Sequence, residues 1–358
     1  MNERFETMLN WVAHLPFLAE QKISPPLSAS SDASFRRYFR IQVTNREGGG
    51  QGELSLLKGG DSGVENSYII MDAPVEQEDC RPFIRISEQL LSMGLHVPKV
   101  LAQNLEQGFL LLSDLGSQTY LSAMKSASES EVDRLYQNAL TALITLQSKG
   151  KKIANTLPDY DARLLDTEMN LFSDWFVETH LNITLDKIEQ QSWQSVKETL
   201  QRSALAQPKV YVHRDYHSRN LMVTASNTPS ILDFQDAVQG ALTYDAVSLL
   251  RDCYIAWPEE QVIEWQRAYF LQLCAVNLMH KNEWSNFQKS MDLMGVQRHL
   301  KASGIFARLN HRDGKEAYLK DIPLTLDYIV SVGAKYTELT DLVRLIDTKV
   351  LPRMSDLT

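Results

Sequence analysis

The most constraining feature of this sequence is a polar loop between apolar runs, at residues 211–223. The loop carries His213, Asp215 and Asn220 at the spacing H-x-D-x4-N. A further apolar run then leads to Asp233, thirteen positions after Asn220. Buried strands on both sides of a loop fix the positions of its polar side chains, so this stretch predicts a site built for chemistry rather than an ordinary surface turn.

The residue types in this loop suit phosphoryl transfer. That reaction needs Mg2+ against the phosphates and a carboxylate directed at the attacking hydroxyl group. Because Mg2+ prefers oxygen ligands and keeps several waters, Asn220 and Asp233 would be a sufficient protein contribution. Asp215 is then expected to be the catalytic base, which accepts the proton of the substrate hydroxyl. The alternative for each residue taken singly is a turn cap, since Asp and Asn are common in loops.

Length, charge and apolar pattern exclude several classes. The chain has 358 residues, enough for two domains, and a formal net charge of −9 that repels polyanions, so no nucleic-acid partner is expected. Residues 1–6 lack the features of a signal peptide, and no run of about 18 apolar residues occurs, so we expect a cytoplasmic protein with no membrane partner. Cys80, Cys253 and Cys274 form no C-x-x-C pair and are expected to be buried thiols.

The N-terminal part of the chain has the pattern of a small antiparallel sheet with helices. The expected elements are a helix over residues 3–22, strands over 35–43, 53–58 and 68–72, a helix over 81–93 that ends at Gly94, and strands over 97–102 and 108–112. Residues 48–52 are glycine-rich and predict a flexible loop. Residues 113–116 follow as the best linker candidate.

The remainder of the chain has the pattern of long helices, interrupted by the polar loop. The expected helices cover residues 128–148, 166–180, 185–205 and 246 to the end, with breaks at Pro258, around Gly295, from Gly304 to Gly314 and near Gly333. This pattern predicts an α+β, two-lobe chain with a small β-rich lobe at 1–112 and a large helical lobe at 113–358 that holds the polar loop. Ligands favour the cleft between such lobes.

The polar loop resembles the catalytic loop of the protein-kinase-like superfamily, H-R-D-x4-N followed by D-F-G, and more closely that of its aminoglycoside phosphotransferase branch, H-x-D-x-H-x-x-N. His217 matches the second histidine of that branch, while Gln235 departs from the glycine of D-F-G. Only twelve positions separate Asp233 from Asp245 and no A-P-E motif follows, which leaves no room for the activation loop that protein substrates require. We therefore expect a small-molecule acceptor and no protein substrate.

The resemblance also implies a two-lobe protein-kinase-like fold and the use of ATP with Mg2+. Asp245 resembles an aspartate that the branch carries at the same point, where it caps a helix or anchors a loop. His213 is expected to anchor the loop through backbone hydrogen bonds, and His217 to lie on the acceptor side.

Further segments resemble the anomeric N-acetylmuramate/N-acetylglucosamine kinases, bacterial enzymes of cell-wall recycling that phosphorylate the C1 hydroxyl of an amino sugar. These segments are residues 31–40, 71–74, 108–112, 168–176 and 304–309. An amino-sugar 1-kinase is therefore the predicted function. The alternatives are an aminoglycoside kinase or another metabolite kinase of the same branch and, from a different class, a nucleotide-binding pseudokinase without catalysis.

The predicted nucleotide site departs from the kinase pattern at two positions. Its phosphate loop, Ser31, Asp32, Ala33 and Ser34, is small but not glycine-rich. Met71 occupies the position at which kinases carry a phosphate-binding lysine. An arginine suits phosphate oxygens, so the missing charge is expected from Arg36, Arg37 or Arg40, unless these alternate along an exposed edge strand.

Adenine is expected against backbone groups at Leu112, Ser113 and Asp114. For the acceptor sugar, Glu168, Asp174 and Trp175 occur within one predicted helix. Residues 168 and 175 share a face of that helix, so a carboxylate and an indole ring could line one pocket, with the ring stacked on a sugar. The alternative is an amphipathic helix with Trp175 in the core and the acids in solvent.

Overall fold

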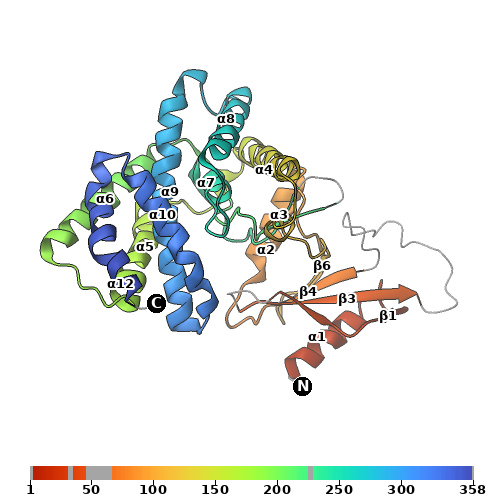
Figure 1. Cartoon of the computed structure of the whole chain (residues 1–358). Coiled ribbons are helices and arrows are strands. Elements are labelled where there is room, and N and C mark those ends of the chain that lie inside the picture. The colour runs from red at the N-terminus through yellow and green to blue at the C-terminus, as the bar shows by residue number, and fades with distance from the viewer. Residues whose placement is uncertain (1–2, 31–34, 46–66, 225–228, 357–358) are drawn as a thin grey trace. The chain divides into compact units, whose positions relative to one another are not determined.

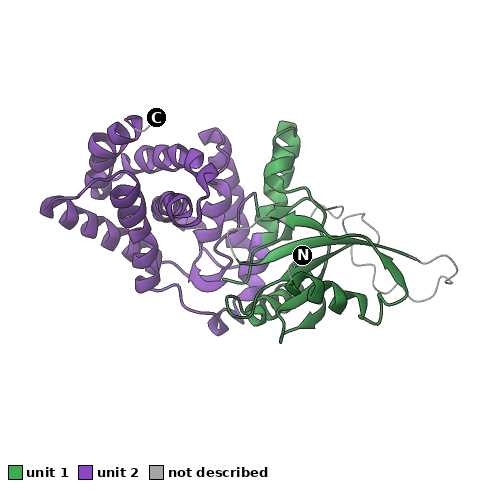
Figure 2. Cartoon of the chain, turned by 90° about the horizontal axis from the view of Figure 1, so that it is seen from below, with its two compact units in different colours: residues 1–142, 219–236 green, residues 143–218, 237–358 purple. Residues whose placement is uncertain are grey.

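The computed structural model describes residues 3–30, 35–45, 67–224 and 229–356, which form two compact units. Unit 1 consists of residues 1–142 and 219–236, and unit 2 of residues 143–218 and 237–358, as coloured in Figure 2. The predicted division at residues 112 and 113 remains a prediction. Within the described ranges, no helix combines the length and the apolar character that a membrane span requires.

Unit 1 is built on an antiparallel sheet with the strand order β1-β3-β4-β6-β5, and β2 pairs beside β3 (Figure 1). The strands are β1 Gln21–Ile23, β2 Leu27–Ser30, β3 Arg37–Asn45, β4 Ser67–Asp72, β5 Val100–Asn104 and β6 Phe109–Ser113. The strands predicted at 68–72, 97–102 and 108–112 are thereby confirmed, with β5 starting later than expected. The predicted strand at 53–58 and loop at 48–52 lie outside the described residues.

Two helices of unit 1 were predicted from their apolar period. Helix α1, Glu3–Ala13, buries Met8 and Val12 in a core that it shares with Ile41 and Ile70 of the sheet. It ends well before residue 22, because Pro16 cannot continue a helix. Helix α2, Cys80–Ser92, begins at an Asp79 side chain that accepts a hydrogen bond from the Arg81 N–H, and Gly94 follows its end with φ 82°, the left-handed conformation that favours glycine.

A short hairpin of unit 1 carries both predicted metal ligands at its ends. It consists of β8, Leu221–Met222, and β9, Ser230–Ile231. The Ile231 N–H donates to the His96 carbonyl at 2.8 Å, and the Val223 N–H donates to the Gln118 carbonyl at 2.8 Å, just before α3. Helices α3, Tyr120–Met124, and α4, Glu129–Gly150, follow the sheet. The hairpin is thus attached to unit 1 on both sides.

Unit 2 is mainly helical, with one small antiparallel pair of strands, β7 and β10. Its elements are η2 Ala154–Thr156, α5 Ala162–Leu171, η3 Phe172–His180, α6 Lys187–Leu205, β7 Lys209–Val212, β10 Val238–Ala241, α7 Tyr244–Leu250, α8 Glu259–Ala275, η4 Lys281–Glu283, α9 Trp284–Asp313, η5 Glu316–Asp321, α10 Ile322–Gly333, η6 Thr337–Leu339, α11 Thr340–Leu345, η7 Ile346–Val350 and α12 Leu351–Ser355. The expected breaks at Pro258 and Gly333 are confirmed.

Helix α9 corrects the prediction that Gly295 and Gly304 break the chain. The helix runs through both and ends only at Gly314, which has φ 66°. A Cβ at Gly304 would lie 2.2 Å from the backbone carbon of Leu171, and one at Gly295 would lie 2.1 Å from the Tyr328 hydroxyl. These glycines therefore permit close packing, and α9 contacts α5, α6, α7, α10 and η3 from the middle of the unit (Figure 1).

All three cysteines remain thiols, as predicted. Cys80 and Cys253 are buried, whereas Cys274 is only partly buried on α8.

Candidate active site

The catalytic loop leaves β7 and is fastened by a buried aspartate of the next helix. Asp245, in the first turn of α7, accepts hydrogen bonds from the backbone N–H groups of His213 at 2.7 Å and Arg214 at 2.9 Å. Arg214 has φ 79°, an unfavourable conformation for a non-glycine residue that these bonds maintain. Thr243, not Asp245, precedes the helix as its cap, so Asp245 acts as a loop anchor. Inside the loop, His213 Nδ1 accepts from the Asp215 N–H at 3.2 Å.

The side chain of Arg214 enters a buried ionic cluster around Glu168, which is 4% exposed. Glu168 pairs with Arg214 at 2.5 Å and with Lys301 at 3.2 Å. It also accepts hydrogen bonds from the hydroxyl of Tyr160 and from the side-chain amide of Gln297. Two cations and two neutral donors thus surround this carboxylate, which ties Arg214 of the catalytic loop to Lys301 of α9.

The electrostatic environment keeps Asp215 ionised. Burial alone would raise the pKa of its carboxyl group, but four neighbouring groups outweigh burial and hold the pKa well below its ordinary value: Lys301, His217, Arg298 and Arg214. An ionised carboxylate is an acceptor only, as a group that orients a substrate hydroxyl must be. For Asp245, by contrast, burial raises the pKa to about 7, although the two backbone N–H groups oppose the rise.

The predicted metal ligands lie together in unit 1. Asn220 Nδ2 donates to Asp233 Oδ2 at 3.3 Å, and the Leu232 N–H donates to the Asn220 carbonyl at 2.8 Å. Asp233 has φ 59°, and Gln235 Nε2 donates to its Oδ1 at 2.8 Å. A carboxylate beside an amide is a donor set that fits Mg2+. Gln235 was not predicted as a site residue; its place directly after Asp-Phe was the available signal.

The structure distinguishes between the three candidate arginines. Arg37 pairs with Asp72, and Arg40 pairs with Asp114 at 2.6 Å. Arg36 pairs with Glu78 at 2.8 Å, and the charge of Asp233 is among the influences that raise its pKa.

Arg36 is protonated and carries a positive charge. Burial would lower its pKa, but the net shift is upward because of Tyr38, Glu78, Asp236 and Asp233. Arg36 is thus a permanently charged group beside a predicted metal ligand, and Glu78, which the sequence analysis did not identify, orients it.

Some of the groups that were predicted to contact the nucleotide already form hydrogen bonds within the protein. Leu112 pairs with Ile69 and Val100 in the centre of the sheet, and the Ser113 N–H donates to the Lys99 carbonyl at 2.9 Å. The Asp114 carboxylate accepts from Arg40, Ser67 and the Gly116 N–H, so its side chain fixes the linker. The adenine contact predicted for this segment would therefore require backbone groups other than the Ser113 N–H. Ser31, Asp32, Ala33 and Ser34 lie outside the described residues.

The predicted acceptor residues are not brought together on one helix face. Helix α5 ends at Leu171 and continues as the π-helix η3, which shifts the side-chain register after Phe172. Glu168 is buried, whereas Asp174 is exposed and accepts from Ser173 at 2.9 Å, and Trp175 is partly buried. The expected pairing of the Glu168 carboxylate with the Trp175 indole is therefore corrected, because Glu168 faces the ionic cluster instead.

The acceptor side of the loop retains His217, which is 8% exposed. Its ring lies 5.3 Å from the Tyr254 ring in an edge-to-face contact. The next residue, Ser218, donates from its backbone N–H at 2.9 Å and from its hydroxyl at 2.5 Å to Asp252. These two anchors at Asp245 and Asp252 fix the loop before and after Asp215.

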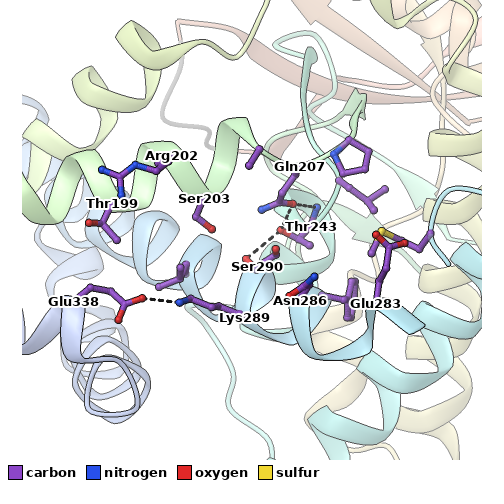
Figure 3. Close-up of a pocket in the computed structure, with 16 residues that line it drawn as sticks. Thr199, Arg202, Ser203, Gln207, Thr243, Glu283, Asn286, Lys289, Ser290 and Glu338 are labelled. Atoms are coloured by element: carbon purple, nitrogen blue, oxygen red, sulfur yellow. Dashed lines mark hydrogen bonds and ion pairs between the residues drawn. The ribbon is translucent and has the colours of Figure 1, made fainter. Parts of the chain in front are cut away.

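A pocket of about 460 Å3 lies elsewhere in unit 2, and none of the predicted site residues lines it. Figure 3 shows its polar side chains, which come from α6, α9 and the segments beside them. Lys289 pairs with Glu338 at 2.6 Å, and Gln207 accepts a hydrogen bond from the Thr243 hydroxyl at 2.8 Å. Several polar groups of the pocket thus pair with one another, although Gln207 Nε2 is buried without a hydrogen-bond partner among the described residues, and the catalytic loop remains the candidate site.

Comparisons with known proteins agree with this geometry. A model of the phosphotransferase enzyme family matches residues 28–281. The chain is 43% identical to an N-acetylmuramate/N-acetylglucosamine kinase of Pseudomonas aeruginosa, over 96% of each chain, and 45% identical to a protein of the same name from Pseudomonas putida, over 89% of this chain and 86% of the relative. An aminoglycoside phosphotransferase crystallised with ADP is similar in fold, with a TM-score of 0.55 at 15% identity, over 92% of this chain and 98% of that one. The predicted α+β, protein-kinase-like fold is confirmed.

Proposed function

Since the chain belongs to the phosphotransferase enzyme family, we propose that this sugar kinase transfers the γ-phosphoryl group of ATP to the C1 hydroxyl of N-acetylmuramate and N-acetylglucosamine. The observation that carries the choice of acceptor is the similarity to relatives of that name over 89–96% of the chain. The catalytic loop supplies the chemistry, because its base is ionised and its backbone is fixed by Asp245.

Asp215 acts as the base in this proposal. Its carboxylate accepts a hydrogen bond from the C1 hydroxyl, holds that oxygen in line with the γ-phosphorus, and takes up the proton as the new P–O bond forms and the bond to ADP breaks. The nearby cations Lys301 and Arg298 keep the carboxylate ionised before the reaction. Little further work is required of the protein, since phosphoryl transfer depends mainly on positioning and charge.

Nucleotide binding is assigned to unit 1. Asn220 and Asp233 would hold Mg2+, which neutralises charge on the β- and γ-phosphates when bound. Arg36 would contact the phosphates in place of the usual lysine, because Met71 at that position is fully buried and apolar. Residues 31–34 would complete the phosphate contacts. We further propose that the enzyme acts in the cytoplasm, where ATP is present.

The competing functions are an aminoglycoside kinase and a pseudokinase. The first shares the fold, as the similarity to aminoglycoside phosphotransferases requires, but the relatives that match at 43–45% identity carry the amino-sugar name. The pseudokinase alternative arises because Met71 occupies the position of the phosphate-binding lysine of kinases. The ionised Asp215 of the catalytic loop, together with Asn220 and Asp233, would have no shared purpose in a chain that only binds nucleotide, which favours an active enzyme.

An acceptor panel with labelled ATP and Mg2+ tests the proposal. The purified chain is incubated with N-acetylmuramate, N-acetylglucosamine, kanamycin, gentamicin and ethanolamine, and labelled product is separated and counted. We expect transfer to the two amino sugars, and loss of their reducing-end reactivity because C1 is blocked. Transfer to an aminoglycoside or to ethanolamine alone would reverse the assignment, and ATP binding without turnover on any acceptor would favour the pseudokinase.

A further inference from the structure

Arg298 of α9 is a buried guanidinium for which the reaction described above has no binding role. It is 4% exposed, yet its Nε and Nη1 groups meet no hydrogen-bond acceptor among the described residues. Leaving guanidinium N–H groups buried and unsatisfied is costly in free energy, more so than for neutral groups. Such a group is common where a bound ligand supplies the missing acceptor.

The position of Arg298 on α9 places it beside the catalytic loop. Gln297 and Lys301, one residue before it and three after it on the same helix, both contact Glu168, which in turn pairs with Arg214. Residues at i and i+3 are neighbours on a helix surface, so Arg298 continues the face that supports the loop. Its electrostatic partners include Asp215, Tyr244 and Asp252 as well as the Cys253 thiol.

The surrounding anions are engaged elsewhere. Glu168 is shared by Arg214 and Lys301 at 2.5 and 3.2 Å. Asp252 accepts from the Ser218 N–H and hydroxyl at one oxygen and from the Tyr254 N–H at the other, at 2.9, 2.5 and 3.0 Å. Arg298 therefore adds a positive charge close to the catalytic base, without a dedicated carboxylate partner among the residues that the structure describes.

We propose that Arg298 determines acceptor specificity, by binding an acidic substituent of the sugar whose hydroxyl faces Asp215. This inference rests on the proposed function. Of the two amino sugars, N-acetylmuramate carries a lactyl carboxylate on C3, which is separated from the reacting C1 carbon by C2 alone, whereas N-acetylglucosamine has a neutral hydroxyl there. A buried guanidinium that still has an N–H group to offer can donate a charge-assisted hydrogen bond to a carboxylate. Arg298 thus favours the acidic acceptor over the neutral one.

The test compares the two acceptors in wild type, Arg298→Gln and Arg312→Gln, the last being an exposed arginine at the end of the same helix. We expect Arg298→Gln to lower kcat/KM for N-acetylmuramate roughly 10- to 100-fold, mainly through KM, as for the loss of a charged hydrogen bond. The kcat/KM for N-acetylglucosamine should fall by a clearly smaller factor, because the loss of a cation near Asp215 affects both acceptors equally, and the remaining turnover of this sugar shows that the variant is folded. Arg312→Gln should leave both acceptors unaffected.

A neutral ester of the lactyl group gives a second measurement that needs no variant. Wild type should treat the methyl ester of N-acetylmuramate as poorly as Arg298→Gln treats the free acid, and the variant should not distinguish the ester from the acid. An equal loss on both sugars would overturn the proposal, since Arg298 would then act on the phosphoryl group or on the fold. If wild type phosphorylates neither sugar, the proposed function itself fails, an outcome that is separate from equal loss in the variant.

Discussion

Replacement of Glu168 by glutamine tests whether this residue supports the catalytic loop or binds the acceptor. Glu168 is 4% exposed and compensates two cations, the buried Lys301 and the partly buried Arg214. Glutamine keeps the shape but removes the charge, so both cations lose their counter-ion, Lys301 in a buried position. Removing one partner from a buried ion pair costs ~3–5 kcal/mol, a large share of the ~5–15 kcal/mol by which a domain is stable.

Urea unfolding followed by tryptophan fluorescence gives the free energy of unfolding for wild type and Glu168→Gln. Asp159→Asn is the matched control, because Asp159 forms an ion pair of 3.0 Å with Lys209 in the same unit, with both side chains about half exposed. The control should lose less than ~1 kcal/mol, as expected for a surface pair. The double variant Glu168→Gln with Lys301→Met should recover part of the loss, because it removes one of the two uncompensated charges.

Kinetics complete this test. At temperatures where the variant is folded, its KM for the acceptor should remain within about twofold of wild type, while kcat falls because Arg214 no longer holds the loop beside Asp215. A fall in stability below ~1 kcal/mol together with a large rise in acceptor KM would refute the reasoning. Glu168 would then be a sugar ligand, as its sequence context alone suggests.

Two other substitutions test the nucleotide site and the loop anchor. Arg36→Gln should raise the KM for ATP about tenfold with little change in acceptor KM, whereas Arg37→Gln should leave it nearly unchanged because Arg37 pairs with Asp72; equal effects would contradict the assignment. Burial raises the pKa of Asp245 to about 7, so the folded state binds the extra proton and this residue's contribution to stability is lost as pH rises from about 4 through 7. Asp245→Asn should therefore lose stability less steeply than wild type over that range in urea unfolding, and parallel slopes would count against it.

Local sequence patterns were sufficient to predict several strands of unit 1 and the breaks between helices at Pro258 and Gly333. The apolar period alone located α2, β4 and β6, and the spacing of Asn220 and Asp233 anticipated a contact that the structure places at 3.3 Å.

Features that depend on long-range packing could not be predicted in the same way. Gly295 and Gly304 look like helix breaks until Tyr328 and Leu171 are known to pack against them. The π-helix η3, which begins at Phe172, could not be predicted from the local pattern either. Its different register means that Glu168 and Trp175 do not share a helix face as expected.

The ion-pair partners of charged side chains were the hardest feature to predict from the sequence. Arg36, Arg37 and Arg40 were equivalent from sequence, because their partners Glu78, Asp72 and Asp114 lie 42, 35 and 74 positions away. The burial of Arg298 could not be predicted either, because nothing in its local sequence distinguishes it from an exposed helical arginine.

The central claim is that Asp215 serves as the base of a sugar kinase, and one paired measurement tests it most directly. Wild type and Asp215→Asn are compared for transfer of labelled phosphate from ATP to N-acetylmuramate and for ATP affinity by calorimetry. We expect the kcat of the variant to be at least about a thousandfold lower than that of wild type, and its Kd for ATP to be within about threefold of the wild-type value. Near-normal turnover by Asp215→Asn would contradict the claim.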